Sequence, residues 1–177
     1  SHRKTQYISK DINHRNGMLR SIINMLERDH QVISLVLPPT VIDIRMFNWQ
    51  QYKSEVKYTF QTKLENEESI FKNMDPSIRR QIKKAQKQNF DFDKGNNERT
   101  IDDFYTLHKL SLNRQGQKPK FNRENFNALI ADLNSAPCNI SFYLAYHSGK
   151  PIAAQANVSY KETAYYWLAG GDPDYFN

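Results

Sequence analysis

Two runs of alternating residues near the end of the chain restrict the fold most. In residues 139–146 and 152–160 the even-numbered positions are mostly apolar and the odd-numbered positions are mostly polar. The four residues between them, His147-Ser148-Gly149-Lys150, form a turn sequence, so the runs predict a β-hairpin with one buried face. A third, aromatic run at 163–168 ends in Gly-Gly-Asp-Pro and predicts another strand.

The residues before these strands predict helices. Helical spacing begins near residue 67. Thr100, with Asp103 three residues later, predicts the start of a helix that Gly116 ends. Asn122 predicts the start of the next helix, which has Phe126, Leu129, Ile130 and Leu133 on one face. Both helices should pack on the sheet, so we expect an α+β fold with helices flanking a central, mostly antiparallel mixed sheet.

The first third of the chain has a different pattern. Residues 18–29 have the spacing of a helix, and the apolar runs at 32–37 and 40–47 predict strands on either side of Pro38-Pro39. Residues 56–64 alternate between apolar and polar side chains and predict a half-buried strand. Strand alternation gives way to helical spacing between residues 65 and 75, which is where we expect a domain boundary.

Composition excludes several classes of protein. A chain of 177 residues that is 38% hydrophobic can bury a core and is not expected to be disordered. It contains neither an apolar run of roughly 20 residues nor a signal segment, so no transmembrane segment is expected. The single cysteine, Cys138, excludes an internal disulfide, is expected to pack in the core, and fits a cytoplasmic protein. The net charge of +6 favours anionic partners, namely phosphates, nucleic acid or the inner face of a membrane.

One predicted helix carries much of this charge. Asp75-Pro76 is a preferred helix start, with a side-chain oxygen at the N-cap and proline at the first position. No acidic residue occurs between Pro76 and Asn89. Like charges four residues apart repel each other, and binding of phosphates or carboxylates would relieve that repulsion. A solvated face neutralised by acids elsewhere explains the pattern equally well. The basic residues of this helix are Arg79, Arg80, Lys83, Lys84 and Lys87.

The common catalytic signatures are missing. The chain has no Gly-x-Ser-x-Gly elbow, phosphate loop, dinucleotide fingerprint or zinc helix, and its histidines lack metal-ligand spacing, so we expect no metal site. His108 is expected to pack in the core rather than to act as a general base. Tyr165-Tyr166-Trp167 could bind a ring or fill the core, and alternation puts Tyr166 on the opposite face from its two neighbours.

Several short motifs together resemble a known family. They are the Arg79 to Ala85 helix, the helix that contains Asp102 to Leu107, Tyr143 to Tyr146 with Gly149 to Ala154, and the residues from Ala164 to Tyr166 and from Gly170 to Pro173. In this order they resemble the GNAT-type domain of the Fem family, which includes the aminoacyltransferases that build peptidoglycan cross-bridges. The resemblance spans about residues 56–177.

The resemblance implies an acyl- or aminoacyl-transferase. Fem-like proteins have two tandem GNAT-like units, so residues 3–65 would end a first unit and residues 66–177 would begin a second. The donor would be acyl-CoA or aminoacyl-tRNA, with no tightly bound cofactor, and the acceptor an anionic cell-envelope precursor that is nucleotide-linked or a polysaccharide. The implied acceptor groove lies near Tyr165, Tyr166, Arg114 and Lys118, and no catalytic residue is implied.

The sequence also departs from this family. GNAT proteins that use acyl-CoA place a glycine-rich pyrophosphate loop after the fourth strand, and no such loop precedes Asn177. We therefore expect these residues to be a fragment whose donor site cannot be assigned. Whether this fragment is active by itself stays open.

A second function class also stays open. A non-catalytic nucleic-acid-binding module would use the basic helix to follow phosphates, and its affinity would fall steeply with salt. We favour the transferase because the charge is concentrated on one helix and the aromatic-interleaved signatures of RNA-binding domains are missing.

Overall fold

The structure is a computed structural model that describes the backbone of residues 2–175 and the side chains of residues 10–175. The chain divides into two compact units, residues 1–64 and residues 65–177. Each unit is described by itself. That these units belong to two tandem GNAT-like domains stays a prediction.

In its described residues, the first unit consists of two helices and irregular chain. Helix α1 spans His2–Asp29 and helix α2 spans Arg45–Trp49. The small core of this unit forms where Ile23 of α1 packs with Met46 and Phe47 of α2. An Arg15 hydrogen bond to the carbonyl of Thr40, at 2.7 Å, ties the irregular segment back to α1.

The strands expected at 32–37, 40–47 and 56–64 do not form. Residues 31–44 and 52–66 contain neither helix nor strand, and α2 begins inside the second expected strand. The predictions were wrong because an apolar or alternating run describes only one side of a strand pairing. A strand also needs a neighbour for its backbone hydrogen bonds, and the described part of this unit offers none.

The second unit contains the predicted sheet. Strands β1 (Phe90–Gly95), β2 (Asn139–His147), β3 (Lys150–Tyr160) and β4 (Thr163–Gly171) lie in the order β1-β2-β3-β4, and each pair is antiparallel. With the helices of the same unit this confirms the α+β prediction. Strand β1 was missed because it has only six residues and two of them are aspartates.

The turns and irregularities of the sheet follow from local chemistry. Ser148 and Gly149 both have positive φ, 50° and 77°, which is the two-residue geometry that fits the twist of a hairpin. A shift in the β3–β4 register makes Leu168 pair with Ala156 and Tyr166 with Asn157, leaving Trp167 as an extra residue.

The described residues of the second unit contain four α-helices. They are α3 (Glu67–Asn73), α4 (Pro76–Gln86), α5 (Glu98–Arg114) and α6 (Arg123–Ser135), and the short helix η1 (Pro173–Tyr175) follows β4. The predicted start of α5 needs correction. Its N-cap is Asn97 rather than Thr100, because the Asn97 side chain accepts a 2.9 Å hydrogen bond from the Thr100 amide.

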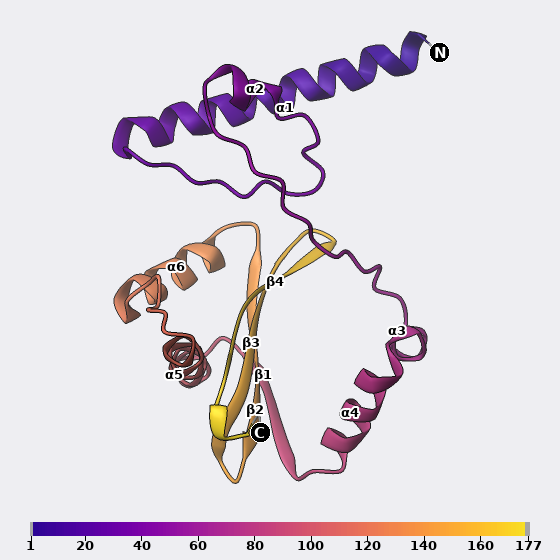
Figure 1. The fold of residues 1–177 in the computed structure, drawn as a ribbon, viewed down its shortest axis with the longest axis vertical. Coiled ribbons are helices and arrows are strands. Elements are labelled where there is room, and N and C mark those ends of the chain that lie inside the picture. Colours follow the sequence, from indigo (N-terminus) through magenta and orange to yellow (C-terminus); the bar gives the residue numbers. More distant parts are fainter. Residues whose placement is uncertain (1, 176–177) are drawn as a thin grey trace. The chain divides into compact units, whose positions relative to one another are not determined.

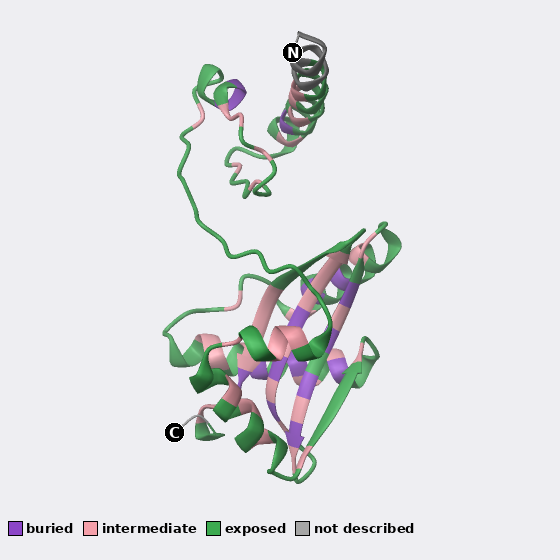
Figure 2. Ribbon diagram, turned by 90° about the vertical axis from the view of Figure 1, so that its right-hand side faces the viewer, coloured by how far each residue is buried: buried purple, intermediate pink, exposed green. Residues whose placement is uncertain are grey.

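Helices α5 and α6 cover one face of the sheet (Figure 1). Between them and the sheet lies an aromatic core in which Phe104 contacts Phe142 and Phe126, with ring centroids 4.8 and 5.9 Å apart. Figure 2 shows buried and partly buried residues alternating along the strands. In contrast, α3 and α4 make almost no contact with the sheet.

Helix α5 approaches the sheet closely at Gly170 of β4. A Cβ atom built on Gly170 would lie 2.3 Å from the backbone nitrogen of His108. Beside this contact, His108 Nδ1 lies 2.8 Å from the Ala169 carbonyl oxygen, and the amide of Gly171 donates to Ser111 Oγ at 2.9 Å. Helix α5 thus provides hydrogen-bond partners for the backbone groups of Ala169 and Gly171, which lie on the edge of β4 that no described strand pairs with.

Candidate anion-binding site on helix α4

Helix α4 starts as the sequence predicts. The Asp75 carboxylate accepts a 2.7 Å hydrogen bond from the Ser77 amide, and Pro76 is the first helical residue. Hydrogen bonds from the side chain and the backbone of Ser77 lower the pKa of Asp75, and the charge of Arg79 adds to the effect. Asp75 therefore stays ionised and holds the first turn in place.

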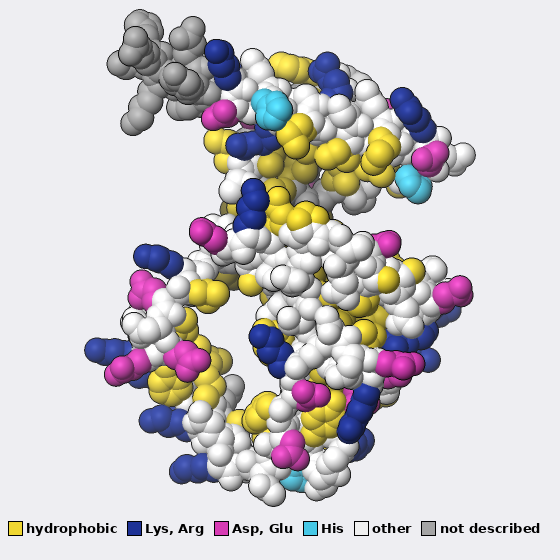
Figure 3. Space-filling view, turned by 180° about the vertical axis from the view of Figure 1, so that it is seen from behind, with side chains coloured by type: hydrophobic (Ala, Val, Ile, Leu, Met, Phe, Trp, Pro, Cys, Tyr) yellow, Lys and Arg dark blue, Asp and Glu magenta, His cyan; other side chains and the backbone are white. Residues whose placement is uncertain are grey.

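The basic residues of α4 have no acidic partner within salt-bridge distance among residues 10–175. The ion pairs of the described residues all lie elsewhere. In Figure 3, Lys and Arg side chains project from the part of the surface that carries α3 and α4, with Asp and Glu side chains among them. Repulsion between the basic side chains of α4 remains available to be relieved by an incoming anion. The four ion pairs are Arg45–Asp43, Arg99–Asp103, Arg123–Asp102 and Lys150–Asp172.

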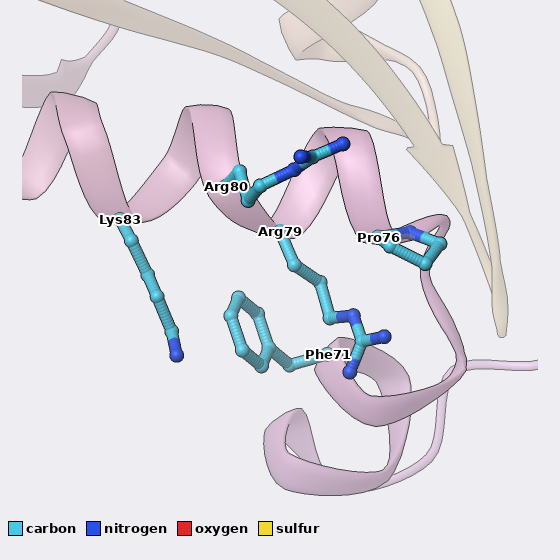
Figure 4. Close-up of a pocket in the computed structure, with 5 residues that line it drawn as sticks. All are labelled: Phe71, Pro76, Arg79, Arg80 and Lys83. Atoms are coloured by element: carbon cyan, nitrogen blue, oxygen red, sulfur yellow. The ribbon is translucent and has the colours of Figure 1, made fainter.

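Three of these cations line a shallow hollow between α3 and α4. Its volume is about 410 Å³, and it is lined by Phe71, Pro76, Arg79, Arg80 and Lys83. The side chains of Arg79 and Lys83 extend from α4 on the side where Phe71 lies, and Arg80 leaves the helix in another direction (Figure 4). The hollow thus combines an apolar wall with positive charge.

Lys83 and Arg79 differ in their surroundings within this hollow. The ammonium nitrogen of Lys83 lies 6.0 Å from the centre of the Phe71 ring, at the outer limit of a cation–π contact. Arg79 Nε is buried and has no hydrogen-bond partner among the described residues. A buried donor without an acceptor is costly, so a carboxylate or phosphate oxygen that reached Arg79 would satisfy a group that the fold leaves open.

The other basic residues predicted for the site lie outside the hollow. Lys84 is an exposed residue of α4 that does not line it. Arg114 is the last residue of α5, and Lys118 follows the turn at Gly116, whose φ of 69° ends the helix as predicted. Both are exposed.

The structure separates the two predicted tyrosines from each other and from the end of α5. Tyr166 pairs with Asn157, whereas Tyr165 pairs with Val158, which packs against the core. The two tyrosines therefore occupy opposite faces of β4. Both lie in the first half of the strand, whereas Arg114 lies one helical turn beyond Ser111, which contacts the last residue of the strand.

Two polar residues of α5, Asp103 and His108, make contacts within the core of the second unit. His108 stacks on Phe104, with ring centroids 5.9 Å apart, and its Nδ1 is bound to the Ala169 carbonyl, which agrees with the predicted packing role. The hydroxyl of Tyr146 donates to Asp103 at 2.9 Å, and burial followed by this bond raises the pKa of Tyr146 to about 12.

Sequence reasoning missed Phe71 as a residue of the site. Its helical context was visible, but nothing in the sequence placed its ring beside Arg79 and Lys83. A signal did exist in the proline at position 76, because a residue before proline avoids the helical region. That restriction separates α3 from α4 and lets the two helices face each other.

Comparison with known families supports a transferase. A family model described as an acetyltransferase (GNAT) domain matches residues 72–177, from the end of α3 through α4 and the whole sheet. No curated protein matches the chain. Among the described residues, no helix is both long and apolar enough to cross a membrane.

Proposed function

The chain belongs to the family of acetyltransferase (GNAT) domains, and from this premise we propose that it transfers an acyl group to an anionic cell-envelope precursor. Because the chain belongs to this family, its reaction is the transfer of an acyl group. The acceptor would be an amine or hydroxyl on a precursor that is nucleotide-linked or a polysaccharide. The resemblance of residues 56–177 to Fem-type enzymes supports this narrower acceptor class.

The observation that carries the proposal is the unpaired charge of α4. Arg79, Arg80 and Lys83 line the hollow, and the ion pairs of the described residues leave all three free. Arginine binds carboxylates and phosphates through two parallel hydrogen bonds, and lysine adds a compact charge. We therefore assign the anionic group of the acceptor to this hollow.

Acyl-CoA is the donor that GNAT domains generally use. In such a reaction the acceptor amine or hydroxyl attacks the acyl carbonyl, the carbon–sulfur bond breaks, and the thiol leaves with the proton that the nucleophile loses. No covalent bond to the protein is needed, so holding the two reactants in the right orientation supplies much of the acceleration. An anchored phosphate on the acceptor would contribute to that orientation. An aminoacyl-tRNA donor belongs only to the narrower Fem-type proposal.

Binding measurements on charge-reversed variants test the assignment. Lys83→Glu reverses a charge that lines the hollow, whereas Lys87→Glu makes the same change at the end of α4, outside it. We expect Lys83→Glu to weaken binding of a UDP-linked muropeptide precursor roughly tenfold, with Lys87→Glu changing it about twofold. The thermal midpoint of both variants should match that of the unchanged protein, because neither lysine has an ion-pair partner among the described residues.

The same titrations separate the transferase from the nucleic-acid-binding alternative. Binding should be measured for the precursor, for acyl-CoA and for generic RNA at two salt concentrations. Saturable precursor binding that depends on Lys83 supports the proposal. Equal losses in the two variants, or binding of RNA alone with a steep dependence on salt, would remove the hollow from the mechanism.

A further inference from the structure

The end of α5 and its connection to α6 carry a second concentration of positive charge. Residues 104–123 contain five cationic side chains and no acidic one. Arg123 is paired with Asp102, and the other four cations have no ion-pair partner among the described residues. The next acidic residue, Glu124, lies in the first turn of α6, where the helix dipole favours a carboxylate. A surface with both signs interspersed avoids a field of one sign, whereas this segment attracts anions. The four cations, all exposed, are Lys109, Arg114, Lys118 and Lys120.

Hydrogen bonds hold this segment in one conformation. The amide of Gln117 donates to the Leu112 carbonyl at 2.9 Å, which closes the end of α5. Farther along the chain, the hydroxyl of Tyr105 donates to the Phe121 carbonyl at 3.0 Å. The chain therefore turns back along α5 before α6 begins. Lys109 lies four residues after Tyr105 and on the same side of the helix, so the returning chain and the end of α5 form one surface.

Two apolar side chains are exposed on the same surface. Leu110 and Phe121 are 40% and 37% exposed. Leu110 lies four residues before Arg114 on α5, and Phe121 directly follows Lys120, so each apolar side chain has a cation beside it. This combination matches the headgroup layer of an anionic bilayer. Lysine and arginine reach lipid phosphates there through their long stems, and leucine and phenylalanine enter the boundary of the acyl chains.

Nucleic acid matches this surface less well. Proteins that bind single strands stack the bases on exposed aromatic rings. Within residues 104–123, all of which the structure describes, Phe121 is the one exposed aromatic ring. The ring of Tyr105 already faces the guanidinium of Arg123, whose central carbon lies 5.3 Å from the ring centre. Contact with phosphates also leaves the exposed Leu110 without a partner, whereas a bilayer accommodates it.

We propose that the end of α5 and its connection to α6 bind the surface of an anionic membrane. The four cations lie at the level of the lipid phosphates, and Leu110 and Phe121 enter the boundary between the headgroups and the acyl chains. Each cation at such a surface strengthens binding on the order of fivefold, and salt screens this contribution. The contact is therefore peripheral and reversible. It does not rest on the proposed acceptor or on the hollow beside α4.

Sedimentation with lipid vesicles tests this contact on the whole 177-residue chain. We expect binding to vesicles of equal parts phosphatidylcholine and phosphatidylglycerol, and none to vesicles of phosphatidylcholine alone. Changing both Lys118 and Lys120 to Glu should weaken binding to the mixed vesicles roughly tenfold or more. The matched control changes Lys53 and Lys161 to Glu, which are also exposed and without an ion-pair partner among the described residues. This control removes the same charge elsewhere and should change binding about twofold at most, and circular dichroism can confirm that both variants fold.

An uncharged variant tests the apolar part of the contact. Leu110→Gln keeps the charge and should weaken binding severalfold, including at a salt concentration that screens the cations. The proposal is overturned if the unchanged protein ignores the mixed vesicles, if the two double variants lose binding equally, or if Leu110→Gln binds as the unchanged protein does. Binding of generic RNA that depends on Lys118 and Lys120, without binding to vesicles, would likewise overturn it in favour of nucleic acid. None of these results alters the precursor titrations of the α4 variants, so the two proposals fail separately.

Discussion

Replacing Gly170 by alanine should destabilise the second unit more than its one added carbon suggests. The new Cβ would lie 2.3 Å from the His108 nitrogen, 2.5 Å from the Leu107 carbonyl carbon and 2.8 Å from the His108 Cα. All three are backbone atoms of α5, so no side chain can rotate away. Either α5 moves off the sheet or β4 bends.

The expected cost follows from what that movement breaks. Overpacking a well-packed contact costs about 1–3 kcal/mol. Moving α5 also lengthens the His108–Ala169 and Ser111–Gly171 hydrogen bonds, each contributing about 1 kcal/mol. We therefore expect a loss of about 3–5 kcal/mol in the free energy of unfolding, and a fall of about 10 °C in the melting temperature.

Urea unfolding followed by circular dichroism measures this loss, and Gly95→Ala is the matched control. A Cβ on Gly95 would meet nothing closer than 3.4 Å, and its nearest neighbour is the end of the Asn97 side chain. That variant should change the free energy of unfolding by less than about 1 kcal/mol. If Gly170→Ala is no less stable than Gly95→Ala, the close packing of α5 on β4 is refuted.

Two predictions concern the dependence of stability on pH. The pKa of Tyr146 is raised to about 12. The contribution of Tyr146 to the free energy of unfolding should therefore be complete below pH 10 and lost as the pH rises from 10 towards 12. Tyr146→Phe should cost about 1 kcal/mol at neutral pH by removing the bond to Asp103 and should abolish that alkaline loss, as urea unfolding between pH 8 and pH 11 would show. The hydrogen bond from the Lys150 ammonium, 2.6 Å away, lowers the pKa of Asp172. The contribution of this pair to stability is therefore complete above the ordinary pKa of 3.8 and is lost as the pH falls through the lowered pKa. Lys150→Met should lower the free energy of unfolding at pH 7 and make the acid loss shallower, whereas acid unfolding identical to that of the unchanged protein would contradict the pairing.

The features that sequence predicts correctly depend on neighbours within a few residues. The start of α4 at Asp75-Pro76, the end of α5 at Gly116 and the turn at Ser148-Gly149 each follow from the conformation of one or two residues. The hairpin of β2 and β3 was predictable for the same reason, because its partner strand follows immediately in the sequence. Local chemistry fixes both the turn and the pairing.

Pairing between distant segments is where the sequence reading failed. Residues 56–64 alternate as regularly as β3 does, but they form no strand because nothing in the described part of the first unit pairs with them. Conversely, β1 was missed although it is a strand, because its partner β2 begins 44 residues after β1 ends. Alternation shows what a segment could bury, and only the arrangement of the whole chain decides whether it does.

Local sequence likewise predicts one part of the candidate site and not the other. The charge of α4 lies within one stretch of eleven residues, so the sequence alone identifies it. The hollow requires α3 and α4 to meet at an angle, and this angle is made by Met74 and Asp75, which both have extended backbone conformations, with ψ of 153° and 137°. Pro76 explains the conformation of Asp75, but no local rule sets that of Met74. Residue type therefore predicted that an anion would be attracted to α4, and only the fold could show that the charge lies beside Phe71 in a recess.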